Sequence, residues 1–321
     1  MARGPLAQLA EHRAFNPGVR GSIPWRPTFS VFRFVSSRRV GTNGLNESMS
    51  RSRPGAQALI GLLLAAVAIA TFIAGRQPLS ILIAVVCVIA YGELRVVFVP
   101  TGRAPTLVVG AAGVLGFLTL GYHGRLSSLP SVAVALVLVL LTIWVVMHEA
   151  TGRHEHATED ISGTLAAAAI VGVMGAHILL IRSIPRAGFR GLLAFGLMVL
   201  LNDAFAFFGG RALGHRPLWQ RLSPNKTVEG AMSGFLASVA VGAIAGFALD
   251  PPFDPRSGLA LGAAIGVLTP VGDLAFSAVK RSAGRKESGR VFGPLGGALD
   301  AVDALLFCAP FFYWAFRTIA L

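Results

Sequence analysis

The chain has 321 residues, of which 54% are hydrophobic and only 13% charged, and its mean hydropathy is +0.67. A water-soluble domain carries about 25% charged residues, so the composition excludes an ordinary soluble protein. Both cysteines, Cys87 and Cys308, lie inside apolar stretches, which excludes a disulfide scaffold. The net charge of +13 comes mostly from arginines between apolar stretches. This placement favours loops facing anionic lipid and phosphate-bearing substrates, and we expect no nucleic acid partner.

Residues 1–53 differ from the rest of the chain. They contain nine arginines with scattered proline, glycine, serine and asparagine, and no sustained hydrophobic period. This composition predicts a basic, disordered arm. A secretory signal is not expected, because no apolar core follows a short basic start. The sequence leaves open whether translation begins at Met1 or at Met49, just before the first apolar stretch.

From residue 54 on, the sequence predicts a series of membrane-spanning helices. The stretches from Arg53 to Arg76 and from Arg125 to His148 each enclose 22 residues without a formal charge. A helix needs about 20 apolar residues to cross a bilayer, and continuous rather than alternating apolar stretches exclude a barrel. We therefore expect an all-α, polytopic integral membrane protein. Its nine expected spans are residues 57–74, 79–99, 105–121, 130–148, 162–181, 189–208, 229–249, 258–279 and 303–319.

The spans fall into two regions of different character. Region 54–188 has short connections, whereas region 189–321 carries most acids within spans and two long basic loops. Arginine and lysine collect in the even-numbered loops, and an excess of positive residues marks the cytoplasmic side. We therefore expect a multi-pass protein of the cytoplasmic membrane, with both basic loops in the cytoplasm. The loop after the fifth span departs from this rule, because Arg182, Arg186 and Arg190 lie on the opposite side.

Four aspartates lie in or beside the last spans, where inserting a carboxylate costs about 2.5–3.5 kcal/mol and marks a functional candidate. They are Asp203, Asp273, Asp300 and Asp303. With the expected topology, all four lie at cytoplasmic helix ends. Asp300 and Asp303 flank the start of the ninth span and share a helix face if the turn there is helical. Glu93, near the end of the second span, is expected to reach the interface beside Arg95.

Two basic loops adjoin these acids. Residues Ser223–Gly230 lead into the seventh span, and the second loop follows Lys280 and ends in a glycine turn. Mg²⁺ takes hard oxygen ligands, one or two carboxylates plus substrate phosphates, while lysine and arginine offset the remaining phosphate charge. The residues alone therefore predict phosphoryl or nucleotidyl transfer at the cytoplasmic face. A purely structural role, with each aspartate paired to an arginine, is the weaker interpretation for four acids on one side.

The C-terminal residues resemble the phosphatidate cytidylyltransferases, or CDP-diacylglycerol synthases, over about residues 200–310. One matching stretch runs from Asp203 to Arg211 and resumes from Ser223 to Gly230. The other aligns without a gap at Ser277, Lys280, Arg281, Lys286, Gly289, Gly296, Gly297, Asp300 and Asp303. The chain departs from the family pattern at Glu287 in place of aspartate, at the reversed Gly293-Pro294, at Leu295 in place of histidine and at Ala301 in place of arginine.

The resemblance implies transfer of a cytidylyl group from CTP to phosphatidate in the bilayer, giving CDP-diacylglycerol and pyrophosphate, with Mg²⁺ as cofactor. The implied catalytic residues are Asp273, Lys280, Arg281, Asp300 and Asp303, and the implied metal ligands are Asp273, Asp300 and Asp303. The implied substrate-binding residues are Asp203, Arg211, Ser223, Asn225, Lys226, Thr227, Glu229, Ser277, Lys286, Gly296 and Gly297. The oligomeric state, a homodimer included, is left open.

Three alternatives remain open. A CTP-dependent polyprenol or phytol kinase shares the resemblance but transfers the γ-phosphate. A catalytically inactive relative would account for Leu295 and Ala301. A transporter would account for acids within spans, but not for two phosphate-type loops on one face.

Overall fold

The computed structural model describes residues 54–99, 104–151, 157–219, 223–249, 253–289, 291–292 and 296–320. The predicted arm at 1–53 and the family positions Gly293, Pro294 and Leu295 lie outside these ranges. The described residues belong to one compact unit, Ser52–Leu321.

Nine α-helices lie in the described ranges, each over one of the nine stretches expected from the sequence. They are α1 (Pro54–Ala74), α2 (Arg76–Phe98), α3 (Ala104–Tyr122), α4 (Leu129–Thr151), α5 (Ala157–Ser183), α6 (Gly188–Leu213), α7 (Val228–Ala248), α8 (Pro255–Ser282) and α9 (Ala298–Ala320). A short 3-10 turn, η2 (Leu126–Ser128), precedes α4. The expected start of the last span was wrong, because α9 begins at Ala298 and includes Asp300 and Asp303 in its first two turns.

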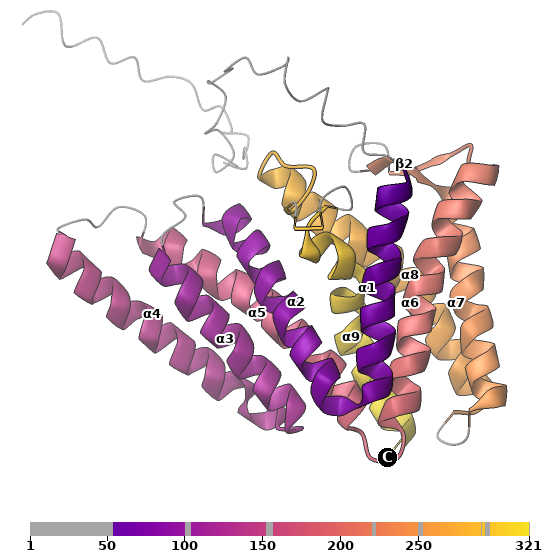
Figure 1. The fold of residues 1–321 in the computed structure, drawn as a ribbon, viewed down its shortest axis with the longest axis horizontal. Helices are drawn as coiled ribbons and strands as arrows, with labels where there is room; N and C mark the ends of the chain where they lie inside the picture. The colour runs from indigo at the N-terminus through magenta and orange to yellow at the C-terminus, as the bar shows by residue number, and fades with distance from the viewer. Residues whose placement is uncertain are drawn as a thin grey trace, which may run out of the picture. The chain divides into compact units, whose positions relative to one another are not determined.

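The structure confirms the all-α class, and the connection between α6 and α7 adds one short hairpin that the sequence does not predict. There β1 (Pro217–Trp219) and β2 (Ser223–Thr227) pair as an antiparallel hairpin. The sequence of β2, Ser-Pro-Asn-Lys-Thr, is poor in the β-branched and aromatic residues typical of strands, so it gives no strand signal. Its pairing with β1 is therefore a tertiary feature, and it lies at one end of the helices (Figure 1).

The helices pack in two groups that α9 connects. In the first group, α5 packs against α2, α3 and α4, and in the second, α7 packs against α6 and α8. Helix α9 contacts α2 and α5 of the first group and α8 of the second (Figure 1). One apolar core includes Phe195, Phe312 and Phe316, and the other includes Tyr91 and Leu306. Because α9 contributes to both cores, its position depends on both groups.

Glycines let α7 and α8 approach backbone to backbone. A Cβ added at Gly242 of α7 would collide with the carbonyl oxygen of Gly258 in α8, and one at Gly262 would lie 2.5 Å from the carbonyl oxygen of Ser238. Small residues at such crossings are typical of membrane helices, which associate largely by close packing.

The close contact at Gly242 predicts that a glycine-to-alanine substitution there changes the melting temperature far more than the same substitution at Gly196. Gly242→Ala is expected to lower the melting temperature of the detergent-solubilised protein, since overpacking costs about 1–3 kcal/mol. Gly196→Ala, in α6, meets nothing within 4 Å and is expected to leave the melting temperature unchanged or higher. Equal shifts in the two variants would show that the α7–α8 contact is not close.

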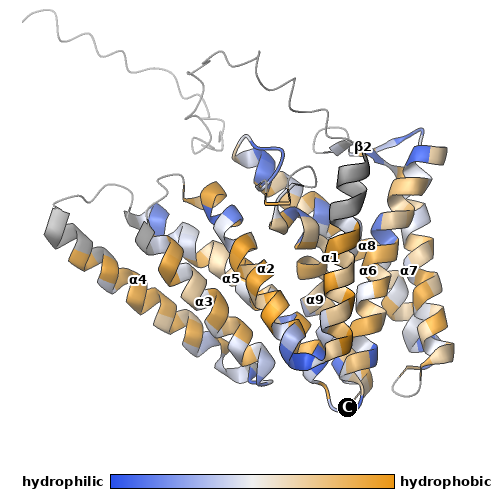
Figure 2. Cartoon of the chain, viewed as in Figure 1, coloured by the Kyte–Doolittle hydropathy of each residue, from blue (hydrophilic) through white to orange (hydrophobic). Residues whose placement is uncertain are grey.

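The described part has the apolar surface of a multi-pass membrane protein. Six of its helices, α2 and α5–α9, are long and apolar enough to cross a membrane, while α1, α3 and α4 contain shorter apolar stretches. Large apolar side chains lie exposed on the helices, among them Ile244 at 64% and Phe247 at 77%. Figure 2 shows that hydrophobic residues cover the middles of the helices and hydrophilic ones collect at their ends. Such a surface requires lipid around it.

Candidate active site

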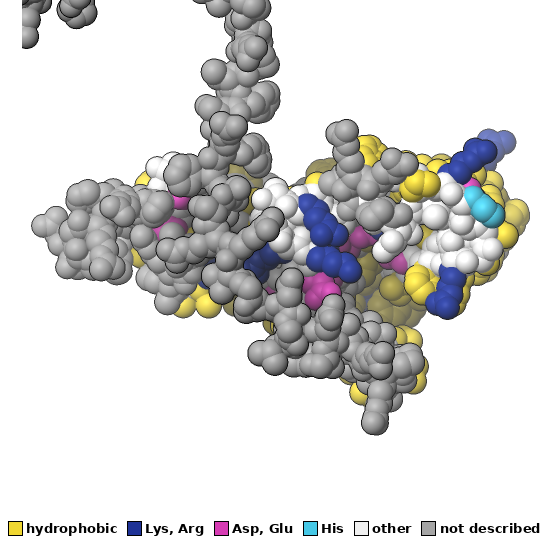
Figure 3. Space-filling model, turned by 90° about the horizontal axis from the view of Figure 1, so that it is seen from above, with side chains coloured by type: hydrophobic (Ala, Val, Ile, Leu, Met, Phe, Trp, Pro, Cys, Tyr) yellow, Lys and Arg dark blue, Asp and Glu magenta, His cyan; other side chains and the backbone are white. Residues whose placement is uncertain are grey.

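The four aspartates gather toward one end of the helices, as the sequence predicts, but Asp203 and Asp273 lie two to three turns before the ends of α6 and α8. Asp203 lies on α6, Asp273 on α8, and Asp300 and Asp303 lie on α9. Asp273 is within electrostatic range of both Asp203 and Asp303. Figure 3 looks onto this end, where lysine and arginine side chains lie beside carboxylates and apolar side chains lie deeper. The aspartates of the site therefore come from three helices, α6, α8 and α9.

The accessible part of the site is the ion pair between Lys226 and Asp273. The hairpin strand β2 carries Lys226, whose Nζ donates to Oδ2 of Asp273 on α8. The two side chains are 30% and 32% exposed, so a ligand can reach both. The hairpin thus places the lysine of the first basic loop onto the acid of the eighth helix.

A buried cluster around Lys280 lies next to this pair. Nζ of Lys280 donates to Oδ1 of Asp300 at 2.6 Å and lies 3.6 Å from Oδ2 of Asp303. The three side chains are only 7–15% exposed. Lys280 lies in the last turn of α8 and Asp300 in the first turn of α9, so each charge also suits the dipole of its helix. The cluster confirms that Asp300 and Asp303 share a helix face, and it ties α8 to α9.

The second oxygen of Asp300 organises the turn before α9. Oδ2 accepts hydrogen bonds from the backbone N–H groups of Ser288 and Gly297, both at 2.9 Å. The bond from Gly297 to the residue three positions later is one half of a capping box. Both oxygens of Asp300 are therefore already engaged by the protein.

Glu93 is a site residue whose place the sequence interpretation missed. Its Oε1 accepts from the N–H of Ala298 at 3.0 Å, and its Oε2 accepts from the N–H of Leu299 and the hydroxyl of Ser288 at 2.9 and 2.8 Å. The first N–H groups of a helix have no intrahelical partner, so Glu93 of α2 caps α9. The expectation that Glu93 reaches the interface was wrong, because the residue is only 8% exposed. The sequence feature that could have identified Glu93 as a site residue is its position as an acid within an apolar 23-residue helix.

Three glycines of the second basic loop make room for these carboxylates. A Cβ at Gly289 or Gly297 would collide with the carboxylate of Glu93, and one at Gly296 would lie 2.8 Å from Oδ2 of Asp300. Gly296 also has a φ of +91°, a conformation that favours glycine. The glycines are thus required by the protein's own packing. The substrate contacts expected of Gly296 and Gly297 stay a prediction.

The capping role of Glu93 predicts that its substitution lowers the stability of the protein. Glu93→Gln turns one acceptor into an amide donor that faces backbone N–H groups, and an unmet donor costs about 1–3 kcal/mol. We expect a lower melting temperature and faster hydrogen exchange at Ala298 and Leu299. Glu287→Gln, an exposed glutamate of the same connection, is the matched control and should change neither measurement. Identical exchange in both variants would contradict the cap.

In the first basic loop, two predicted substrate contacts hold the local structure. Thr227 is the N-cap of α7, and its Oγ1 accepts from the N–H of Gly230 at 3.1 Å. Oε2 of Glu229 accepts from the N–H groups of His215 and Arg216 at 3.1 and 3.2 Å. Both residues therefore shape the loop that carries Lys226, and direct contact with a substrate stays a prediction for them.

For the remaining candidates, the described part of the chain shows no side-chain contact that defines a role. Ser277 and Ser223 are partly buried, on α8 and β2. The exposed ones are Arg211, Asn225, Arg281 and Lys286.

The oxygen chemistry of the site suits Mg²⁺. Four carboxyl groups gather around two lysines, so acidic side chains outnumber basic ones within the cluster. In the described residues, no group of three or more histidine, cysteine or acidic side chains is placed to hold a metal ion. Mg²⁺ commonly takes only one or two carboxylates from a protein and the rest of its ligands from phosphates and water. The residues present therefore fit a magnesium ion that arrives with a phosphate-bearing substrate.

The fold and the site together define a helical membrane protein with a cluster of carboxylates and lysines toward one end of its helices. The cytidylyltransferase family model matches residues 56–319. The chain belongs to this family.

Three relatives show how far the similarity extends. The chain is 29% identical to the phosphatidate cytidylyltransferase of Bacillus subtilis over 267 residues, which are 80% of this chain and 95% of that protein. It is 40% identical to the phosphatidate cytidylyltransferase of Aquifex aeolicus over 122 residues, 38% of this chain and 45% of the relative. It is 31% identical to that of Staphylococcus epidermidis over 173 residues, 54% of this chain and 65% of the relative. The last two alignments thus cover less than two thirds of the relatives.

Proposed function

We propose that the protein transfers a cytidylyl group from CTP to phosphatidate, forming CDP-diacylglycerol and releasing pyrophosphate. The observation that carries the proposal is the accessible Lys226–Asp273 pair beside the buried Lys280 cluster, at a helix end of a chain from the cytidylyltransferase family. Three relatives that are similar to this chain are named phosphatidate cytidylyltransferase.

The proposed reaction is a direct displacement at phosphorus. A phosphate oxygen of phosphatidate attacks the α-phosphorus of CTP, the new O–P bond forms, and the bond to the β-phosphate oxygen breaks. Pyrophosphate leaves with the electron pair of that bond. The substrate supplies the nucleophile, so no nucleophilic side chain is required.

The lysines have two different tasks in this proposal. Lys226 is accessible and exchanges its bond to Asp273 for phosphate oxygens, offsetting charge in the transition state. Lys280 is buried and held by Asp300 and Asp303, so it positions α9 and balances the acids. Arg281 and Lys286 are exposed and are available to the triphosphate. The acyl chains of phosphatidate stay in the bilayer, which suits a site at a helix end.

Asp273 and Asp303 would hold Mg²⁺, because they come from two helices and lie within electrostatic range of each other. When bound, the ion neutralises phosphate charge and aligns the reacting groups. Both oxygens of Asp300 already accept hydrogen bonds from the protein. We therefore do not include Asp300 in this pair, and its role as a metal ligand stays a prediction.

The test uses the purified full chain in detergent with Mg²⁺ and CTP labelled with ³²P at the α or the γ position, and offers phosphatidate in one reaction and a polyprenol or phytol in a parallel one. We expect label in the lipid product only from the α position, unlabelled lipid and labelled pyrophosphate from the γ position, and no reaction after chelation of the metal. Transfer of the γ label to a polyprenol or phytol instead would establish the kinase alternative. Absence of any transfer, in protein that is folded by its melting curve, would establish an inactive relative.

We further propose nine membrane-spanning helices, with the site facing the cytoplasm. The basic loops that collect at the site end support this orientation. The prediction is tested in a variant without Cys87 and Cys308, both of which are buried. With a membrane-impermeant maleimide, Ala212→Cys and Ala283→Cys should label in inside-out vesicles, and Gln77→Cys should label in intact cells. Labelling of Ala283→Cys in intact cells would reverse the orientation.

A further inference from the structure

Helix α2 belongs to the first group of helices, yet it brings an acid to the carboxylate site. The aspartates of that site lie on α6, α8 and α9, whereas Glu93 lies on α2. The two residues that flank Glu93 at a distance of two positions both bond to Thr106, near the start of α3. The Tyr91 hydroxyl donates to the Thr106 carbonyl oxygen at 2.6 Å, and Nε of Arg95 donates to the Thr106 hydroxyl at 2.8 Å. The backbone that carries Glu93 is therefore fixed against α3.

Ser288 joins Glu93 to Asp300. The hydroxyl of Ser288 donates to Oε2 of Glu93 at 2.8 Å, and the backbone N–H of Ser288 donates to Oδ2 of Asp300 at 2.9 Å. Ser288 is buried, at 3% exposed. Oδ1 of Asp300 in turn accepts from Nζ of Lys280 at 2.6 Å. A continuous line of hydrogen bonds therefore leads from α2, through the second basic loop, to the buried Lys280 cluster.

Glu93 also holds the start of the helix that carries two of the four aspartates. Its oxygens accept from the N–H groups of Ala298 and Leu299, which immediately precede Asp300. Asp303 follows on the same helix and is one of the two proposed metal ligands. A shift in the first turn of α9 would therefore displace both aspartates together. A misplacement of about 1 Å in an active site can cost about 100-fold in rate.

We propose that Glu93 is a positioning residue for cytidylyl transfer, which holds Asp300 and Asp303 in place through Ser288 and the start of α9. The inference rests on the proposed function. Glu93 is only 8% exposed, so it acts through these residues and not by touching a substrate. Capping of α9 requires only the bonds from the helix N–H groups, and the bond from the Ser288 hydroxyl is not part of a cap. Capping alone therefore does not account for the arrangement.

The first test compares the kinetics of Glu93→Gln and the wild type well below both melting temperatures. We expect the Mg²⁺ concentration for half-maximal turnover to rise about tenfold and kcat to fall about tenfold or more, as is typical when a residue that orients metal ligands is changed. A loss of stability alone would lower the amount of active protein and would leave the Mg²⁺ requirement unchanged. An unchanged Mg²⁺ requirement in Glu93→Gln would therefore overturn the proposal.

Ser288→Ala tests the same line of hydrogen bonds with a smaller change, and it also serves if Glu93→Gln does not fold. The variant removes the hydroxyl that bonds to Glu93 and leaves the N–H groups of α9 capped. It should raise the Mg²⁺ requirement by a smaller factor than Glu93→Gln does. Combining the two substitutions should add little, because residues in one hydrogen-bond network are not additive.

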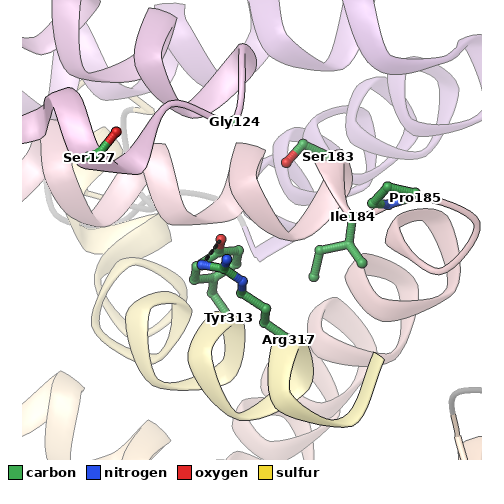
Figure 4. A pocket seen from close by; sticks show the side chains of 7 residues that line it. All are labelled: Gly124, Ser127, Ser183, Ile184, Pro185, Tyr313 and Arg317. Atoms are coloured by element: carbon green, nitrogen blue, oxygen red, sulfur yellow. Dashed lines mark hydrogen bonds between the residues drawn. The ribbon is translucent and has the colours of Figure 1, made fainter. Parts of the chain in front are cut away.

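The matched control is Ser183→Ala, at the other end of the helices. Ser183 lies in the wall of a cavity of about 550 Å³ together with Tyr313 and Arg317, from the last turns of α9 (Figure 4). Its hydroxyl donates to the carbonyl oxygen of Leu180 at 2.8 Å, so this variant also loses one hydroxyl hydrogen bond. The Mg²⁺ requirement should stay unchanged. A rise as large as in Ser288→Ala would overturn the proposal, because loss of any hydroxyl would then have the same effect.

Hydrogen exchange measures the positioning without the reaction. In Glu93→Gln, the N–H groups of Ser288 and Gly297, which both donate to Asp300, should exchange faster than in the wild type. Unchanged exchange at both would overturn the proposal, because Asp300 would then be held without Glu93. A wild-type chain without cytidylyl transfer would refute the proposed function. An active wild type, with unchanged exchange and an unchanged Mg²⁺ requirement in Glu93→Gln, would refute the role of Glu93 alone.

Discussion

Asp273→Asn is expected to lower cytidylyl transfer by about 10³-fold or more while the protein remains folded. The substitution keeps the size of the side chain but removes the charge that holds Lys226 and would bind Mg²⁺. Because Asp273 is about one third exposed, its loss costs little stability. The measurements are turnover as a function of Mg²⁺ concentration, and the melting temperature.

Two other aspartates provide the comparison. Asp254→Asn, at the cap of α8, keeps a good capping residue and should leave turnover unchanged. Asp203→Asn should lower turnover less than Asp273→Asn, because Asp203 lies within electrostatic range of Lys226 and Asp273 but is not one of the proposed metal ligands. Near-normal turnover of Asp273→Asn with an unchanged Mg²⁺ requirement would remove Asp273 from the site.

Lys280→Gln is expected to lose both stability and turnover. The variant leaves Asp300 and Asp303 buried without their cation, and breaking a buried ion pair costs about 3–5 kcal/mol. We expect a large fall in melting temperature. Lys286→Gln, an exposed lysine of the same basic loop, is the control for stability and should melt like the wild type.

A second substitution separates the loss of charge balance from simple misfolding. Adding Asp303→Asn to Lys280→Gln removes one uncompensated carboxylate and should recover part of the melting temperature. Turnover should stay low, because Asp303 is proposed to bind the metal. A melting temperature of Lys280→Gln equal to that of the wild type would mean that the cluster does not hold α8 against α9.

Hydropathy and motif spacing predicted most of what the structure shows. Long apolar stretches form helices because the backbone N–H and C=O groups inside a bilayer must hydrogen-bond to each other. The approximate positions of all nine described helices therefore followed from the apolar stretches. The gathering of Asp203, Asp273, Asp300 and Asp303 followed from their common helix-end depth. The resemblance at residues 200–310 agrees with the family that matches residues 56–319.

Only the tertiary structure decided which partner each charge takes. Glu93 caps α9 from a helix about 200 residues away in sequence, and Lys226 reaches Asp273 because β2 pairs with β1. Such contacts depend on how helices and the hairpin pack, which the residue pattern of one segment does not contain.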